Sequence, residues 1–334
     1  MSLYKTELRR LVMRRFTRWM ALIALLVLVA IALGTAVSNS KVGPEQLAAA
    51  ERMAEENYRE SLAHHQEFIE ECKRSKESGR SDFSEDCEAF PPPSREDFLV
   101  EWYLPPTFDF RNEFGEYILA FAAIMSVIAF VLGASFIGAE WASGGMMNLL
   151  LWRPQRLRVL FAKAGALLTG LIGFTAVAAL AWTAAFWVIA KYRGVSEGMT
   201  SGAWKSFALT ELRGLIMVLV AGLIGFALAS VGRHTAMALG AALGVVVVGQ
   251  FGLGMVLMMA NVRYYEVWLL PTYVLAWIQK KVTLFDYNSC DYSAGYCQPK
   301  TMDIVWQDAG VLFSAIVVLL FGTAMWMMRR RDIA

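Results

Sequence analysis

Residues 117–163 decide the fold, and they read YILAFAAIMSVIAFVLGASFIGAEWASGGMMNLLLWRPQRLRVLFAK. The first part, Tyr117 to Gly138, carries no charged side chain. A helix needs about 20 apolar residues to cross roughly 30 Å of hydrocarbon, so this part is long enough to span a bilayer. The carboxylate of Glu140, a glycine pair and a short apolar segment follow. The pattern predicts a membrane-spanning helix followed by a protruding loop.

Comparable apolar runs occur along the rest of the chain. The sequence is 57% hydrophobic and 18% charged, whereas soluble domains carry about 25% charged residues. We therefore expect an all-α polytopic membrane protein with six transmembrane helices. The predicted spans are residues 20–37, 117–138, 164–190, 214–231, 236–260 and 309–328. The predicted connections are an interfacial helix at 1–19, an external acidic helical domain at 38–116, a cytoplasmic loop at 139–163, external loops at 191–213 and 261–308, and a tail at 329–334.

Basic residues fix the expected orientation, because cytoplasmic loops are enriched in Lys and Arg. Six of them precede the first span and three follow the last, so both termini are predicted to be cytoplasmic. The third-to-fourth connection, which contains Lys191 and Arg213, runs against this trend. A cleaved signal peptide is the alternative for the first span, but its long apolar run and extended basic stretch favour a retained anchor.

The first 19 residues show helical amphipathicity. Apolar residues such as Leu8, Leu11 and Val12 recur at helical spacing, and basic residues fill the positions between them. This pattern is typical of a helix that lies in the membrane interface and binds anionic lipids.

The segment from Ser38 to Gly115 differs from the rest in charge, with 18 acidic and 9 basic residues. Glu45 to Lys73 has a seam of apolar residues between charged faces, which predicts one long helix. The run Pro91-Pro92-Pro93 ends any helix that reaches it. We expect a small external helical domain.

The four cysteines all lie in predicted external loops, where an oxidising environment favours disulfides. Local pairing is the preferred connectivity of the three possible, because each bridge would then close one loop. Metal binding is the alternative. The expected pairs are Cys72 with Cys87 and Cys290 with Cys297.

The second external segment, Asn261 to Asp303, is rich in Trp and Tyr, which favour the headgroup level. Val267 to Ile278 is apolar but short and contains Pro271. Counting it as a crossing would also place the C-terminal arginines outside. We therefore expect a re-entrant or interfacial helix.

The histidines, the fifth span and the glycines give only weak indications of a functional site. Adjacent histidines on a helix point about 100° apart, so His64 and His65 do not share a face, and we predict no metal site. Gln250, a strongly polar side chain within the fifth span, is expected to face protein or a cavity and is a candidate substrate contact. Glycines at small-xxx-small spacing, such as Gly240 and Gly244, predict close helix packing within the subunit, with a dimer face or a flexible substrate path as the alternative. No catalytic constellation is present, and no nucleotide-binding G-x-x-x-x-G-K-[ST] loop occurs in the sequence.

The loop after the second span is the most informative connection. Glu140 stands next to the membrane, where a lone carboxylate needs a partner or water. Gly144-Gly145 predict a sharp turn, and Met146 to Trp152 predict a helix too short to cross the bilayer. Arg153-Pro154 end it, and basic residues follow. An ordinary cytoplasmic turn would also contain arginines, but a protruding short helix suits docking to another protein.

This loop resembles that of the type-2 ABC exporter permeases, whose pattern has Glu, a Gly-Thr turn, a Leu pair, Pro, Arg and Lys at similar spacing. Gly145 stands where that family has Thr, so any role of the hydroxyl is lost. The basic first helix, the re-entrant segment and the closing Arg330-Arg331 are similar too. The matching residues are Glu140, Gly144, Leu149, Leu150, Pro154, Arg156 and Lys163.

The resemblance implies that this loop, with Arg153, is a coupling helix that docks on a cytoplasmic ABC ATPase subunit. The chain would then be no enzyme and bind no cofactor, with ATP and Mg on the partner. The resemblance also implies a second permease copy, giving a homodimer, in the plasma membrane of a bacterium. The chain would contact membrane lipid and would not bind nucleic acid. We expect export of an amphipathic or hydrophobic substrate such as a drug, peptide antibiotic or lipid. The alternative is mechanotransmission, in which ATP hydrolysis moves the external domain to control a periplasmic or cell-wall partner.

Overall fold

The computed structural model describes residues 3–77, 87, 91–152, 155–291 and 297–330. The chain forms two compact units. The larger contains Met1–Ile31, Arg111–Ala185 and Gly198–Ala334, and the smaller contains Ala32–Phe110 and Phe186–Glu197.

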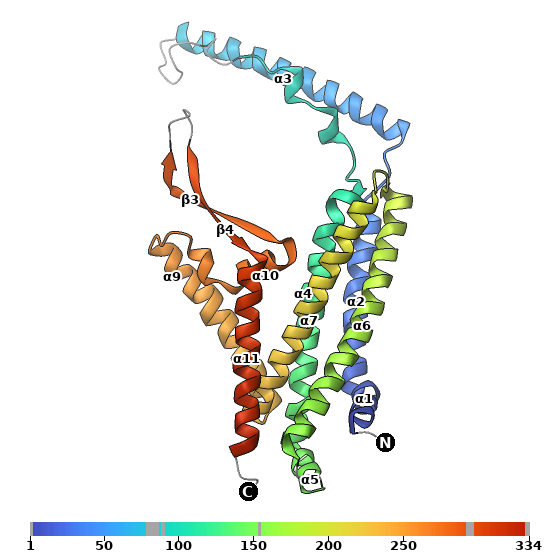
Figure 1. The fold of residues 1–334 in the computed structure, drawn as a ribbon. Coiled ribbons are helices and arrows are strands. Elements are labelled where there is room, and N and C mark those ends of the chain that lie inside the picture. The colour runs from blue at the N-terminus through green and yellow to red at the C-terminus, as the bar shows by residue number, and fades with distance from the viewer. Residues whose placement is uncertain (1–2, 78–86, 88–90, 153–154, 292–296, 331–334) are drawn as a thin grey trace. The chain divides into compact units, whose positions relative to one another are not determined.

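Six helical segments of the described chain are long and apolar enough to cross a membrane, as predicted (Figure 1). They exceed the apolar runs because their helices continue into the polar flanks. For example, the 33 residues of the second measure about 50 Å against roughly 30 Å of hydrocarbon. The six are α2 (Arg15–Ser38), α4 (Phe110–Ala142), α6 (Arg156–Arg193), α7 (Ser201–Gly232), the composite α8–η3–α9 (Thr235–Met259) and α11 (Trp306–Arg330).

Glycines allow α4 and α7 to pack side by side in the larger unit. A Cβ added at Gly133 would strike the backbone carbonyl of Gly222, and one added at Gly225 would strike that of Phe130. Further along, a Cβ at Gly214 would lie 3.0 Å from that of Ala122. Both helices therefore run in the same direction in close contact, as small residues at helix interfaces permit.

The fifth span has a different character. It begins as α8 (Thr235–Gly244), changes to a π-helix, η3 (Val245–Gly252), and ends as α9 (Leu253–Met259). Of the 18-residue apolar stretch within this span, only 6% is buried against the rest of the described chain. Gly240 and Gly244 were expected to support packing, but a Cβ at either would meet nothing within 4 Å among the described residues.

The connection before the last span contains both a predicted and an unpredicted element. Helix α10 (Leu270–Gln279) is the short helix expected there, with Pro271 in its first turn. The strands β3 (Lys281–Asp291) and β4 (Gln298–Val305) then form an antiparallel hairpin, which the all-α expectation missed. Buried side chains of the hairpin, including Leu284 and Ile304, share an apolar cluster with α10 and α11.

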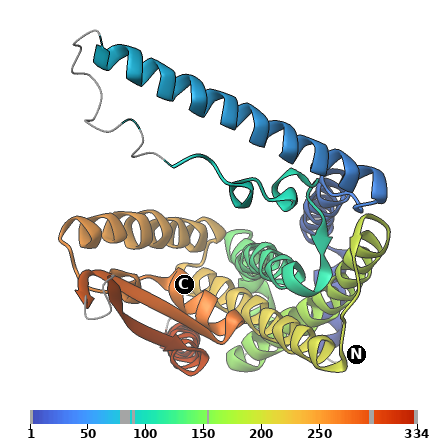
Figure 2. The same ribbon diagram turned by 90° about the horizontal axis from the view of Figure 1, so that it is seen from above.

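The smaller unit is dominated by α3 (Pro44–Glu77), a single helix of 34 residues, or about 51 Å (Figure 2). The short helices η1 (Arg95–Asp97) and η2 (Val100–Tyr103) lie along its flank. Arg95 pairs with Glu55 of α3 at 3.3 Å and stacks over Tyr58, whose ring also meets Phe98.

Two short strands complete the smaller unit. Strand β1 (Phe108–Asp109) pairs in parallel with β2 (Gly194–Val195), and a Cβ at Gly194 would strike the carbonyl of Phe108. Phe108 is fully buried and meets the ring of Phe186 edge-on. This small sheet links the segment before α4 to the segment after α6.

Candidate functional site

A sharp turn separates α4 from the short helix α5 (Gly145–Trp152). Gly144 adopts φ +71°, a left-handed conformation that side chains with a Cβ rarely adopt. Its N–H donates to the carbonyl of Trp141 at 3.2 Å, and its carbonyl accepts from Asn148. The turn therefore ends one helix and begins the next. At eight residues, or about 12 Å, α5 is too short to cross a bilayer.

Helix α5 is anchored at its start and exposed toward its end. Met146 is fully buried, Met147 is 37% exposed and Leu151 is 73% exposed. Leu149 is half-buried, and the predicted residue Leu150 lies in the helix. Arg153 and Pro154, also predicted for this site, lie outside the described residues. A short helix with exposed apolar side chains therefore protrudes beyond the ends of α4 and α6 (Figure 1).

Directly beside this loop, Lys163 forms a buried ion-pair cluster with two carboxylates. Its ammonium nitrogen lies 2.7 Å from Glu7 Oε2 and 2.7 Å from Glu140 Oε2. The side chains of Lys163 and Glu7 are 0% and 1% exposed, and that of Glu140 is 21% exposed. The Phe136 ring lies 5.1 Å from the ammonium group, which adds a cation–π contact.

A second cation balances the charge of the cluster. Arg10 Nη1 lies 3.5 Å from Glu7 and 3.8 Å from Glu140, at the more exposed edge. The cluster thus contains two carboxylates and two cations drawn from three helices, α1 (Leu3–Met13), α4 and α6. Burying such charges is costly, and removing one partner typically costs about 3–5 kcal/mol because the other is left uncompensated. The three helix segments are consequently held as one unit.

Further contacts seat α1 on its neighbours. Tyr4 donates a hydrogen bond to Thr169 of α6 at 2.7 Å, and Leu11 is buried against Gly170. Just after α1, Arg14 donates to the carbonyl of Ser135 in α4 at 3.0 Å. Helix α1 is therefore bound to the rest of the protein by both polar and apolar contacts.

Glu140 and Lys163 were predicted from the sequence as site residues, but Glu7 was missed. The available signal was that Glu7 is the sole acidic residue in the strongly basic stretch 1–19. Its pairing could not be foreseen, because Lys163 is 156 positions away in the chain.

The predicted site residue Arg156 lies apart from this cluster. Its Nη1 donates to the carbonyl of Met328 at 3.4 Å, in the last turns of α11. It therefore links the start of α6 to the end of the last span. Nearby, the rings of Phe161 and Phe226 both lie against Phe321, which packs α6 and α7 against α11.

The remaining predicted positions have structural contacts. Both expected disulfides are present, Cys72–Cys87 and Cys290–Cys297, and each closes a local loop. Gln250 accepts a hydrogen bond at 2.7 Å from the backbone N–H of Leu270, at the start of α10. The amide therefore satisfies a helix-terminal donor and ties the π-helical segment to α10.

Six apolar helices of spanning length, with a short helix between the second and third, define a multi-pass integral membrane protein. The family model described as ABC-2 family transporter protein matches residues 1–320, and the chain belongs to this family. It is the membrane component of an ABC transporter, and permeases of this family generally work with ATPase partners. No curated protein and no solved structure matched the chain.

Proposed function

We propose that this chain is the permease subunit of an ATP-driven exporter and that α5 docks on its ATPase. The observation that carries the proposal is the cluster of Lys163 with Glu7 and Glu140 at the base of α5. It ties the helix before α5, the helix after it and the interfacial helix α1 together. A force applied to α5 would therefore move three helix segments together.

The surface of α5 supports a docking role. Leu151 is 73% exposed at the end of a helix that extends beyond the spans. Exposed apolar surface of this kind often marks a binding site for another protein. Since the sequence has no phosphate-binding loop of the G-x-x-x-x-G-K-[ST] type, the ATP would be bound by that partner.

The distribution of basic residues supports a cytoplasmic position for α5 in this proposal. Within the larger unit, the N-terminal helix and the end of α11 lie at the same end as α5 (Figure 1). This end carries Arg9, Arg15 and Arg18 near the start of the chain, and Arg329 and Arg330 at the end of α11. Such enrichment is typical of cytoplasmic ends. An ATPase in the cytoplasm would therefore meet α5.

The proposed substrate is an amphipathic or hydrophobic compound such as a drug, peptide antibiotic or lipid, exported across the plasma membrane of a bacterium. In this proposal, a second copy of the permease is needed to complete the transport path. The six spans consist mainly of apolar residues, which suits such a substrate better than an ion. The coupling residues proposed are those of the loop, from Glu140 to Lys163.

Cross-linking from Leu151 tests the docking proposal. All four cysteines form disulfides, so Leu151→Cys introduces a single free thiol. In native membranes, we expect a thiol-specific cross-linker at this position to capture a protein whose peptides contain a G-x-x-x-x-G-K-[ST] loop. Val177→Cys is the matched control, because Val177 is 69% exposed but lies within the span of α6. Capture of lipid alone at both positions would contradict the proposal.

A second function, mechanotransmission, is motivated by α3. This helix exposes Leu47, Met53 and Phe68 at 42%, 45% and 36%. A long helix with exposed apolar side chains is suited to engage a periplasmic or cell-wall partner. In this alternative, ATP hydrolysis would move the smaller unit, and no substrate would cross the membrane.

A further inference from the structure

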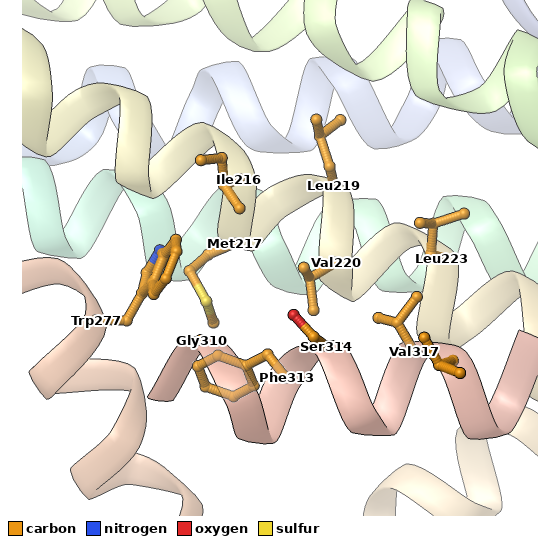
Figure 3. A pocket seen from close by; sticks show the side chains of 11 residues that line it. Ile216, Met217, Leu219, Val220, Leu223, Trp277, Gly310, Phe313, Ser314 and Val317 are labelled. Carbon is orange, nitrogen blue, oxygen red and sulfur yellow. The ribbon is translucent and has the colours of Figure 1, made fainter. Parts of the chain in front are cut away.

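An apolar groove of about 300 Å³ lies between α7 and α11 (Figure 3). In Figure 3, Trp277 stands at one end of the groove, beside Ile216 and Met217, and Leu223 and Val317 stand at the other. The groove follows both helices for about two turns, or roughly 10 Å. Ser314 supplies a hydroxyl group, and the other lining side chains are apolar. The groove therefore suits an apolar chain rather than a polar solute.

Arg213 lies one helical turn from the Trp277 end of this groove. Its guanidinium stacks over the Trp306 ring at 5.5 Å, and its backbone carbonyl accepts from Trp277 Nε1 at 3.0 Å. Its Nη1 is buried and has no hydrogen-bond partner among the residues that the structure describes. A buried charged donor without an acceptor is unfavourable, so an anionic group that reaches the guanidinium of Arg213 would be stabilised there.

The positions of the uncharged runs in α7 and α11 indicate how deep Arg213 and Trp306 lie in the membrane. The uncharged run Gly214–Val231 begins immediately after Arg213, and the uncharged run Ala309–Met328 begins three residues after Trp306. Both helices start these runs at the same end and run side by side in the same direction. Arg213 and Trp306 therefore lie at the headgroup level, where Trp is favoured, and the groove extends from there into the hydrocarbon.

We propose that this groove binds an anionic phospholipid of the bilayer, with one acyl chain between α7 and α11 and the phosphate at Arg213. Charge complementarity selects the head, because a guanidinium forms strong, often bidentate hydrogen bonds with phosphate oxygens. The groove leads from Arg213 into the hydrocarbon, so it fits an acyl chain that is attached to a headgroup bound at Arg213. The site needs only the membrane, so it does not depend on docking of an ATPase.

Lipid titration of the purified protein in mild detergent tests the site. Phosphatidylglycerol and phosphatidylcholine with identical acyl chains are compared by native mass spectrometry, alongside glycerol 3-phosphate alone. Both lipids carry a phosphate, but the cationic choline group of phosphatidylcholine offsets the attraction of its phosphate to Arg213. We therefore expect phosphatidylglycerol to bind wild type about tenfold more tightly than phosphatidylcholine. Glycerol 3-phosphate alone should not bind at these concentrations, because it has no chain to fill the groove.

Four variants separate the head contact from the groove. Arg213→Gln should abolish the headgroup preference, while Arg213→Lys should keep part of it. Ser314→Trp, at an exposed position in the groove, should weaken both phospholipids about equally. Lys205→Gln, an exposed change two turns earlier in α7, should leave the preference intact. An unchanged preference in Arg213→Gln would overturn the proposal.

A photoactivatable phosphatidylglycerol with a diazirine in its acyl chain locates the bound lipid. Cross-linked peptides should concentrate on residues 216–223 and 310–318. Labelling no stronger there than on the exposed Val245–Val248 segment would show only a general lipid annulus and would overturn the site. If labelling at 216–223 is removed by an exported amphiphile but not by phosphatidylglycerol, the groove is a substrate site and the lipid proposal is wrong.

Discussion

Lys163 shows how one buried side chain can organise a membrane protein. Its ammonium group is fully buried yet lies 2.7 Å from a carboxylate oxygen of both Glu7 and Glu140. Such a cluster is stable only when its buried members are paired, because the charges of Lys163 and Glu7 have lost their water. The energetic effect of a substitution here therefore depends on which charges remain.

Lys163→Met should destabilise the protein by about 3–5 kcal/mol, because it leaves the buried carboxylate of Glu7 and the partly buried carboxylate of Glu140 without the cation they share. The change is measured as a fall in the thermal unfolding temperature of the purified protein. Lys191→Met, at an exposed position on the same helix, is the control and should have little effect. Adding Glu7→Gln and Glu140→Gln to Lys163→Met should recover most of the loss. Equal stability of Lys163→Met and wild type would show that the cluster is not a structural centre.

At this scale, the sequence was informative about residue identity and less so about partners. Glu140 and Lys163 were named from the resemblance of their loop to that of known permeases. Their direct pairing was not predicted, and Glu7 was assigned only to a lipid-facing helix. Ion pairs between residues far apart in the chain depend on how helices dock, and amphipathic spacing within one helix carries no information about that.

Among the elements, the spanning helices were predictable and the β3–β4 hairpin was not. Long uncharged runs identify spans from composition alone. By contrast, the hairpin segment mixes aromatic, charged and apolar residues, so the alternation of apolar and polar residues that identifies a strand is weak there. In the structure, Val282 and Leu284 have different neighbours from Thr283. Its aromatic content favoured an interfacial loop instead. The hairpin is stabilised by the apolar cluster beneath it, by a disulfide and by cross-strand polar contacts.

The hairpin should lose protection in acid. Lys281 and Thr283 of β3 donate hydrogen bonds to Asp303 of β4, and they hold the pKa of its carboxyl below the ordinary value of 3.8. A lowered folded pKa gives stability that is present above the ordinary pKa and is lost as pH falls through the folded pKa.

Hydrogen exchange of the β3 and β4 amides, corrected for intrinsic rates, measures this effect. Protection should be constant from neutral pH to about pH 5 and fall below about pH 4. Asp303→Asn keeps the shape of the side chain but cannot titrate, so its protection should show no such step. An equal step in that variant would assign the acid sensitivity to other groups.

For the whole molecule, the sequence separated the apolar core from an acidic segment, and the structure has two compact units. The smaller unit is not confined to the predicted external segment, since Phe186–Glu197 at the end of α6 also belongs to it. This contribution arises from the pairing of β1 with β2, which joins residues 86 positions apart. Two-residue strands have too little sequence to be recognised in advance.

Removing α3 distinguishes the two candidate functions of the whole protein. Residues 45–93 are replaced by a short Gly/Ser linker, and substrate efflux and ATP hydrolysis are measured in cells and membranes. An exporter should retain efflux within about tenfold of wild type, because its spans and α5 are untouched. Cys72→Ser with Cys87→Ser is the control for loss of the disulfide alone. Intact ATP hydrolysis with no efflux in wild type or variant would favour mechanotransmission.

The three-helix ion-pair cluster also constrains how the protein is made. Glu7 leaves the ribosome first, and Lys163 follows 156 residues later. Until then, the carboxylate of Glu7 must remain hydrated at the bilayer surface, since an unpaired charge cannot enter a dry site. Docking of α1 is thus a late step of biogenesis, and it requires that the second and third spans have already been inserted correctly.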